Sequence, residues 1–387
     1  MSEARIDRIT NENNTAGPII SGITTFSGQN FFVPPKGTTA QRPSNCPPGS
    51  IRFNTDSAKL EYFDNLQWLE MEAFNVEIGI STNAAGTSGG LGNRGVFGGA
   101  AISPTAPNYT DSIDYLTIST LGNSISFGSL TGIRGFVASC SSSTRGIWAG
   151  GANPTLTNTI EYVTISSTGN AATFGSLSAI TYTGGGCSNS TRGLIGGGYS
   201  PNVSTTTNVI SYITIASTGD AQDFGDLTRS NHYGTTGSCA SSTRGVWMGG
   251  GIPAGVNVID FITISTIGNA VDFGDALEAR SLLTGGSNST RGVFGGGAYP
   301  TNTNTIQFIT ISTTGNAQDF GDLSATIANA GGATSSTRMV FAGGYTPTKQ
   351  SAIYYVQITT TGNAVSFGDL TSARYGNAGC SNGHGGL

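Results

Sequence analysis

The triplet Asp-Phe-Gly occurs three times in the chain, beginning at Asp223, Asp272 and Asp319. In protein kinases this triplet binds magnesium, and it acts there together with a His-Arg-Asp catalytic loop and a lysine on a strand. The present sequence has neither partner, and a catalytic motif has no reason to recur at a regular interval. We therefore interpret the triplet as structural.

Paired carboxylates are the second candidate for chemistry. Each of these aspartates is followed three residues later by another, and carboxylate pairs can contribute oxygen ligands to a Ca²⁺ site. Two earlier copies of the same stretch have serine as the second member of the pair (Ser129 and Ser176). Arginines follow a few residues downstream as possible surface partners (Arg229, Arg280 and Arg374). We expect no metal site.

Residues for other catalytic chemistry are scarce. The only histidines are His232 and His384, and neither Asp-box repeats nor clustered acid and base residues are visible. Nucleophilic, copper or glycosidase chemistry is therefore hard to assemble. Five cysteines at wide spacing, with no Cys-x-x-Cys pair, are typical of reduced thiols. We expect a protein that is not an enzyme, with no catalytic residue, metal or cofactor.

Most of these residues lie in an internal repeat, which defines the strands and turns that position them. Turns of the type Gly-Asn or Gly-Asp recur at intervals of 47, 50, 49, 47 and 47 residues, at Gly122, Gly169, Gly219, Gly268, Gly315 and Gly362. Each repeat resolves into four short strand signals, and the third strand carries apolar residues on both faces, as expected for a sheet packed between two others. This period, with four strands per unit, indicates a β-propeller.

Two further positions recur in each repeat. One is an arginine, which either forms a charged ring that binds an anion or donates hydrogen bonds to carbonyls at the base of its own repeat; we favour the second (Arg94, Arg145, Arg192, Arg244, Arg291 and Arg338). The other lies five residues before it and holds Cys140, Cys187 or Cys239 in some repeats and Gly or Ala in others. This exchange indicates a small, buried position.

The strand order resembles that of kelch repeats. The second strand ends in glycines (Phe294 to Gly297), and the third and fourth strands carry aromatic residues, although the fourth has Phe where many kelch repeats have Trp. The resemblance covers about residues 78–387 and implies an all-β, six-bladed kelch-like β-propeller. One first-strand signal is surplus, so we expect the C-terminal strand to complete the first blade beside residues 93–130. A short seventh blade is the alternative.

Residues 1–74 differ in kind from residues 75–387 and indicate a separate domain. They hold 14 of the 39 charged residues and no trace of the repeat. Ile51 and Phe53, then Leu60 and Tyr62, alternate around turns and predict a small β-meander that ends near Trp68. A segment this short cannot bury enough surface to be stable alone, so we expect it to oligomerise or to dock on a partner.

Within this segment, the stretch GTTAQRPSNCPPGSIRFNTDSAKLEYFDNLQWLEM is similar to one that recurs in tail-fibre and other virion structural proteins of tailed bacteriophages, especially cyanophages. The resemblance implies that residues 1–74 attach the chain to other virion proteins and that the appended domain is exposed outside. By analogy with fibres we expect a homo-oligomer, taken to be a trimer. The expected location is the virion, after synthesis in the host cytoplasm.

Composition argues against other partners. The net charge is -5, with three lysines and fourteen scattered arginines, so binding to nucleic acid by phosphate neutralisation is disfavoured. The start of the chain is polar and lacks the apolar core of a secretory signal. No stretch approaches the roughly 18 apolar residues of a membrane span, so we expect no membrane insertion.

Variation among the repeats indicates where binding takes place. The connections from strand two to strand three differ between repeats, whereas the turns on the opposite face are nearly uniform. Variable loops on a fixed scaffold are typical binding sites, although internal drift is an alternative explanation. The tyrosines of these loops can stack on a sugar or a protein surface (Tyr109, Tyr199, Tyr299 and Tyr345).

The sequence thus predicts a non-enzymatic phage virion protein, on a tail fibre, baseplate or capsid surface, that displays a propeller for binding a host surface glycan. The alternative is a purely structural or decoration protein whose propeller contacts other virion proteins.

Overall fold

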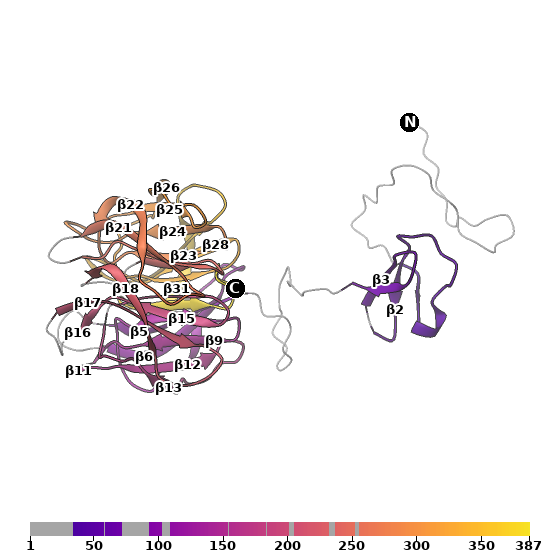
Figure 1. Cartoon of the computed structure of the whole chain (residues 1–387), viewed down its shortest axis with the longest axis horizontal. Helices are drawn as coiled ribbons and strands as arrows, with labels where there is room; N and C mark the ends of the chain where they lie inside the picture. Colours follow the sequence, from indigo (N-terminus) through magenta and orange to yellow (C-terminus); the bar gives the residue numbers. More distant parts are fainter. Residues whose placement is uncertain are drawn as a thin grey trace. The chain divides into compact units, whose positions relative to one another are not determined.

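The computed structural model describes residues 34–57, 59–71, 93–102, 109–153, 155–182, 184–200, 205–231, 237–251 and 255–387. The chain divides into two compact units, Met1–Asn75 and Val76–Leu387 (Figure 1). The described residues form β-strands and one short 3-10 helix, η1 (Thr39–Gln41). Among them, no helix has the length and hydropathy of a transmembrane span. His232 lies outside the described residues.

The first unit contains one small sheet with the strand order β1-β2-β3-β4. Strands β2 (Ile51–Asn54), β3 (Lys59–Phe63) and β4 (Trp68–Glu70) form an antiparallel meander. The two-residue strand β1 (Lys36–Gly37) pairs with β2 in parallel.

The second unit is built from antiparallel sheets that share one strand order. The first strands are β32 (Ala378–Ser381), β8 (Ala138–Ser141), β14 (Gly185–Ser188), β19 (Gly237–Ala240), β23 (Thr284–Ser287) and β27 (Gly331–Thr334). The second strands are β5 (Arg94–Ala101), β9 (Arg145–Ala149), β15 (Arg192–Gly196), β20 (Arg244–Met248), β24 (Arg291–Gly295) and β28 (Arg338–Ala342). We number the sheets one to six in this order, so that the first sheet is β32-β5-β6-β7.

The outer half of each sheet completes the meander. The third strands are β6 (Tyr109–Thr117), β12 (Thr159–Thr164), β17 (Thr205–Thr214), β21 (Val256–Thr263), β25 (Thr305–Thr310) and β30 (Thr348–Gln357). The fourth strands are β7 (Ile125–Ser129), β13 (Ala172–Ser176), β18 (Gln222–Asn231), β22 (Val271–Arg280), β26 (Gln318–Asp322) and β31 (Val365–Arg374). Two-residue strands lie in the connections: β10 (Ala152–Asn153), β11 (Thr155–Leu156), β16 (Tyr199–Ser200) and β29 (Tyr345–Thr346).

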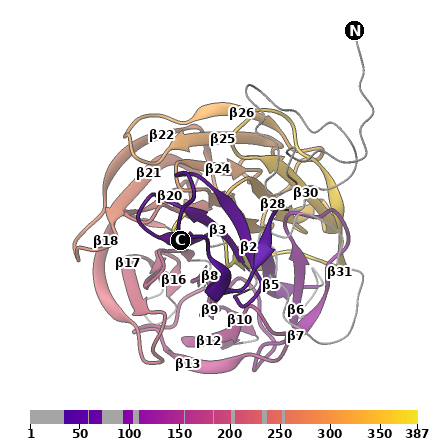
Figure 2. The same ribbon diagram turned by 90° about the vertical axis from the view of Figure 1, so that its right-hand side faces the viewer.

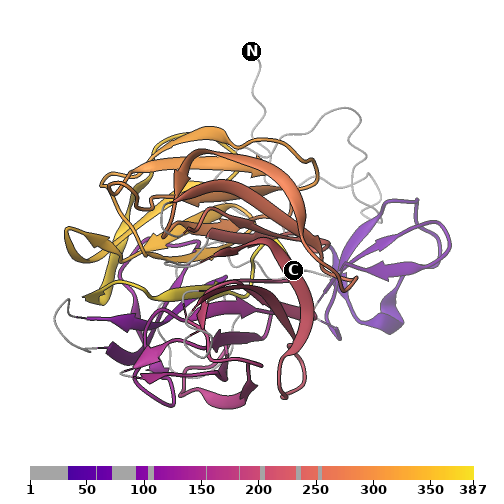
Figure 3. The same cartoon turned by 60° about the vertical axis from the view of Figure 1, so that its left-hand side comes forward.

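The sheets are arranged around a central axis (Figure 2). The first strands of neighbouring sheets contact one another in the order β8, β14, β19, β23, β27, β32 and back to β8. Each sheet is a short, twisted meander that leads outward from this axis (Figure 3). The second unit is therefore all-β and consistent with a β-propeller.

The two ends of the repeat region meet in one sheet. Strand β32 pairs antiparallel with β5, with Ala378 opposite Gly98 and Ser381 opposite Gly95. The predicted pairing of the C-terminal strand with the sheet that begins near residue 93 is therefore confirmed. The alternative extra strand was expected at residues 80–93, nearly all of which lie outside the described part.

The core lies between the sheets. One cluster joins Val96, Ile113 and Phe127 of the first sheet to Trp148 and Ile165 of the second. A Cβ atom at Gly98 would lie 3.0 Å from the Trp148 ring, so the absence of a side chain there leaves room for the indole. Because each sheet is covered on both sides, its strands are apolar on both faces, as predicted.

The cysteines of the second unit are small, buried packing residues, as predicted (Cys140, Cys187, Cys239 and Cys380). Each sulfur packs against the glycine that follows the repeat arginine of the next sheet. A Cβ atom at Gly193, for example, would lie 2.6 Å from the Cys140 sulfur. This contact explains why Gly follows Arg in these repeats.

Candidate functional site

The Gly-Asn turns attach each sheet to the one before it. Gly362 N–H donates to the Phe320 carbonyl over 2.7 Å, and the side-chain oxygen of Asn363 accepts from Asp322 N–H over 3.0 Å. Gly321 has φ +144, and a Cβ atom there would lie 2.5 Å from the Gly362 carbonyl oxygen. The Asp-Phe-Gly triplet of one sheet thus contacts the Gly-Asn turn of the following sheet.

The same contact recurs around the ring. Glycine N–H groups at Gly122, Gly169, Gly219, Gly268 and Gly315 donate to the carbonyls of Phe367, Phe127, Phe174, Phe224 and Phe273, respectively. A β-bulge lies at Gly321, because the register shifts between Ile306 and Gln307 opposite it. The recurring stretch therefore joins neighbouring sheets.

The repeat arginines form a second set of contacts between neighbouring sheets, at the start of each second strand. Each guanidinium donates to an isoleucine carbonyl of the next sheet, as Arg145 does to Ile215 over 2.9 Å. Each also lies over an aromatic ring of its own third strand, with Arg145 4.6 Å from the Tyr162 ring centre. The expectation that each arginine donates to its own repeat was wrong, because the guanidinium reaches the carbonyl that directly follows the third strand of the neighbouring sheet.

Acidic side chains of the third strands are buried between sheets. Asp114 accepts from Thr371 N–H over 3.0 Å and pairs with Arg374 over 3.1 Å. Asp260 accepts from the Thr228 hydroxyl over 2.6 Å, and its burial raises its pKa. Arg374 is therefore not a surface partner of the exposed aspartates, as the sequence had suggested, but the buried partner of Asp114.

The carboxylate pairs Asp223 and Asp226, Asp272 and Asp275, and Asp319 and Asp322 lie on fourth strands at the outside of the ring. Among the residues that the structure describes, no group of three or more Asp, Glu, His or Cys side chains is placed to hold a metal ion.

The strand direction separates two faces of the ring. The uniform face carries the connections from strand one to two and from three to four. The variable face carries those from two to three and from four to the next sheet. Asn93, which precedes β5, lies on the uniform face, where its carbonyl accepts from Ile118 N–H over 2.8 Å. The chain therefore enters the ring opposite the variable face.

The structure brings two of the four candidate tyrosines into one cluster. Tyr109 packs against Phe136 with ring centres 6.3 Å apart, and Phe136 packs against Tyr375 at 5.8 Å. Tyr375 in turn contacts Tyr345 at 5.3 Å. Tyr109 and Tyr345 are thus linked through two aromatic residues.

The other two candidates lie apart from this cluster. Tyr199 packs against Tyr182, with ring centres 5.5 Å apart. Tyr299 is 43% exposed, and its carbonyl accepts from the Arg280 guanidinium over 2.8 Å. The four tyrosines therefore do not form one site.

Sequence reasoning missed Phe136 and Tyr375. Both lie in connections from a fourth strand to the next sheet, whereas only the connections between strands two and three had been compared. The sequence signal was the change of residue type at one position of the repeat, which holds Phe136, Leu282 and Asn329 in three of the connections. In the structure the three residues have nearly the same backbone φ, +56 at Phe136 and +58 at the other two.

Serine hydroxyls line the central channel and join the first strands. Ser188 Oγ donates to the Ser141 carbonyl, Ser141 Oγ to the Ser381 carbonyl, and Ser287 Oγ to the Ala240 carbonyl, each over 2.7 Å. These strands form no main-chain ladder with each other within the described residues, so the hydroxyls satisfy carbonyls that face the channel. The cavity of about 60 Å³ has room for a few waters and not for a sugar.

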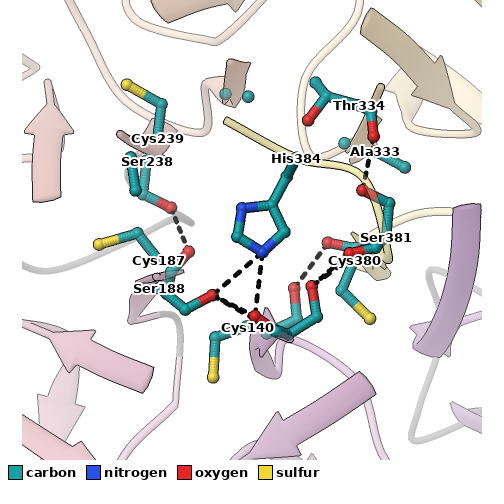
Figure 4. A pocket seen from close by; sticks show the side chains of 18 of the residues that line it. Cys140, Cys187, Ser188, Ser238, Cys239, Ala333, Thr334, Cys380, Ser381 and His384 are labelled. Carbon is teal, nitrogen blue, oxygen red and sulfur yellow. Dashed lines mark hydrogen bonds between the residues drawn. The ribbon is translucent and has the colours of Figure 1, made fainter. Parts of the chain in front are cut away.

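The C-terminal residues close this channel at the uniform face (Figure 4). Gly386 N–H donates to His384 Nδ1 over 3.1 Å, which assigns the ring proton to Nε2. Nε2–H then donates to the Ser141 carbonyl over 2.9 Å. Burial lowers the pKa of His384, so its neutral form fits this place.

The contacts that recur in every sheet therefore lie between neighbouring sheets and hold the ring together, whereas the loops of the variable face differ from sheet to sheet. No family model matches the chain. The search of curated proteins likewise found no match. Its function is inferred from the two faces and the first unit.

Proposed function

We propose that the chain is a non-enzymatic virion protein of a tailed bacteriophage, in which residues 1–74 attach a six-bladed kelch-like propeller that binds a host surface glycan. The observation that carries the proposal is the separation of the two faces. The chain enters at Asn93 on the uniform face, and the individual loops lie on the other. A ring held from one face presents the opposite face outward.

The six blades of this proposal correspond to the six sheets of the second unit. The turn and arginine contacts lead from each sheet to the next, and Gly122 N–H on the Phe367 carbonyl joins the first sheet to the sixth. A seventh blade would have to interrupt these contacts. This favours the six-bladed count over the alternative.

The first unit supports attachment to a partner because its sheet is apolar on the exposed side. Ile51 and Leu60 lie on one face of the meander and are 50% and 40% exposed. The covered face instead buries Glu61, which accepts from Arg42 and from Asn54. A small unit with charges inside and apolar residues outside gains stability when another surface covers it.

Binding to cells tests the proposal. The full chain, labelled with a fluorophore, is incubated with a panel of cyanobacterial strains, and a variant has its connections between strands two and three replaced by the short sequence IPAGVN of the fourth sheet. We expect binding to one or more strains that the variant loses. A matched control replaces Ser289 in a uniform turn by alanine and keeps binding. Equal binding by the loop variant contradicts this role of the variable face.

The second candidate is a structural or decoration protein whose propeller contacts other virion proteins. The exposed apolar face of the first unit favours extensive virion contacts. A reconstruction of the virion distinguishes the two, because a propeller buried among subunits supports decoration and one that projects into solvent supports host contact.

A further inference from the structure

The variable face holds a continuous chain of aromatic rings, which we call the aromatic patch: Tyr109, Phe136, Tyr375 and Tyr345. Its ring centres are 6.3, 5.8 and 5.3 Å apart in that order. All four residues are half-buried, so the rings pack on each other and still reach the surface. Tyr109 and Tyr345 are 236 positions apart in the chain, and closure of the ring brings them together.

The phenol groups of the patch are available to a ligand. Within the described residues, the phenol oxygens of Tyr109, Tyr345 and Tyr375 form no hydrogen bond, and none of them is a buried polar atom, so they are accessible to a ligand. Partial burial and the neighbouring phenols of Tyr109 and Tyr345 raise the pKa of Tyr375. The phenol of Tyr375 therefore remains a hydrogen-bond donor at neutral pH.

Two cations beside the patch already have partners. Arg374, next to Tyr375, is buried and paired with Asp114. Lys349 Nζ donates to the Ile102 carbonyl over 2.5 Å. A phosphate or nucleic-acid ligand would need cations to neutralise it, and these two side chains are already engaged. The patch thus suits an uncharged ligand.

Phe136, one residue of the patch, lies at a backbone position that favours small or flexible residues. Phe136 has φ +56, a region that non-glycine residues adopt at a cost of about 1–3 kcal/mol. Gly376 lies under its ring, and a Cβ atom there would be 2.6 Å from a Phe136 ring carbon. Leu282 and Asn329 have nearly the same φ in other sheets, so the backbone conformation belongs to the repeat, and the aromatic side chain is what distinguishes this position.

We propose that the aromatic patch binds a neutral pyranose unit of a surface polysaccharide. The rings stack on the C–H face of the sugar, and the three phenols exchange hydrogen bonds with its hydroxyl groups. This inference rests on the proposed host-binding function and locates it where the first, second and sixth sheets meet.

The test uses a glycan array with neutral, sialylated and sulfated oligosaccharides, followed by titration calorimetry of the strongest neutral glycan with the full chain. Tyr375→Phe removes one hydroxyl, and we expect affinity to fall by about 2–10-fold. Phe136→Leu removes one ring, and we expect a loss of at least about 10-fold. Leu282 has nearly the same φ in another sheet, so the Leu variant retains the fold.

The matched control is Tyr354→Phe, which removes a hydroxyl from a third strand, outside the patch and the variable loops, and is expected to leave the affinity unchanged. Unchanged melting temperatures exclude unfolding as the cause of a loss. Cell binding is measured in parallel with the same variants.

The outcomes separate the two proposals. If the full chain binds cells and neither patch variant changes that binding, the proposed glycan site is wrong and the host-binding function stands. If cell binding depends on the patch but only charged glycans bind on the array, the ligand class is wrong. If a neutral glycan binds through the patch and the full chain binds no bacterial strain, the proposed glycan site stands and the host-binding function loses support. If the full chain binds neither cells nor glycans, both are overturned.

Discussion

The guanidinium of Arg338 donates a hydrogen bond over 3.0 Å to the carbonyl of Ile118, which lies 220 positions earlier in the chain. The same bond joins Arg94 to Ile165, Arg192 to Ile264, Arg244 to Ile311 and Arg291 to Ile358. With Arg145 on Ile215, these bonds form a closed series in which the Arg338 bond joins the sixth sheet to the first.

Arg338→Leu is expected to lower the free energy of unfolding by about 2–3 kcal/mol, because it removes a hydrogen bond from a charged donor and a cation–π contact with Tyr355. Denaturant unfolding measures the loss. Arg291→Leu makes the same change between the fifth and sixth sheets and should lose a similar amount. A change below about 0.5 kcal/mol in both variants would show that the arginines contribute little.

Gly321→Ala and Gly315→Ala form a pair that separates backbone strain from a steric clash. Both glycines have positive φ, which disfavours alanine by about 1–3 kcal/mol. A Cβ atom meets nothing within 4 Å at Gly315, but at Gly321 it meets the Gly362 carbonyl. We expect Gly321→Ala to cost about 1–3 kcal/mol more than Gly315→Ala in unfolding experiments. Equal losses would mean that the Gly-Asn turn can move away.

Only Cys46 should react with a thiol reagent in the native protein. The thiolate is the reactive form, and burial raises the pKa of Cys140, Cys187 and Cys239 and raises that of Cys380 to about 12. Absorbance with Ellman's reagent is expected to report one thiol in the native state and five after denaturation. Cys46→Ser is the control and should abolish the native reaction. A second fast thiol in the native state would contradict the burial of the inner cysteines.

The contact of His384 with the channel should weaken in acid. Its pKa is lowered in the folded protein, so the neutral form is favoured there and the contact is at full strength above the ordinary value of about 6.5. Protonation at lower pH places a proton on Nδ1, opposite Gly386 N–H, and removes this bond. Hydrogen exchange at Gly386 should therefore accelerate, relative to chemical exchange, as the pH falls below about 6.5. His384→Gln should lack this dependence, and a wild-type profile flat with pH would exclude it.

The period of the repeat was enough to predict the strands and sheets, because each turn and apolar alternation is local. The pairing of β32 with β5 was predicted from the count of strands, because one first-strand signal was surplus. The exchange of Cys with Gly and Ala was enough to predict buried cysteines. The partners of Arg145 and Arg374 were not predictable in this way. Spacing within a repeat does not say whether a side chain turns to its own sheet or to the neighbouring one.

The candidate site was predicted only in part for the same reason. Tyr109 and Tyr345 were recognised from their variable loops, but their proximity depends on Phe136 and Tyr375, which belong to other connections. Contacts across 236 positions arise from closure of the ring, and no local pattern encodes them.

The position of β5 has a mechanical consequence. The chain reaches the ring through this strand, which is bonded along both sides, to β32 and to β6. A tensile load that is applied to the N-terminal end of β5 and directed along the strand shears two ladders at once, so their hydrogen bonds must break together and not in sequence. In the proposed virion role, a strand that is paired on both sides resists drag on the ring better than a strand paired on one side would.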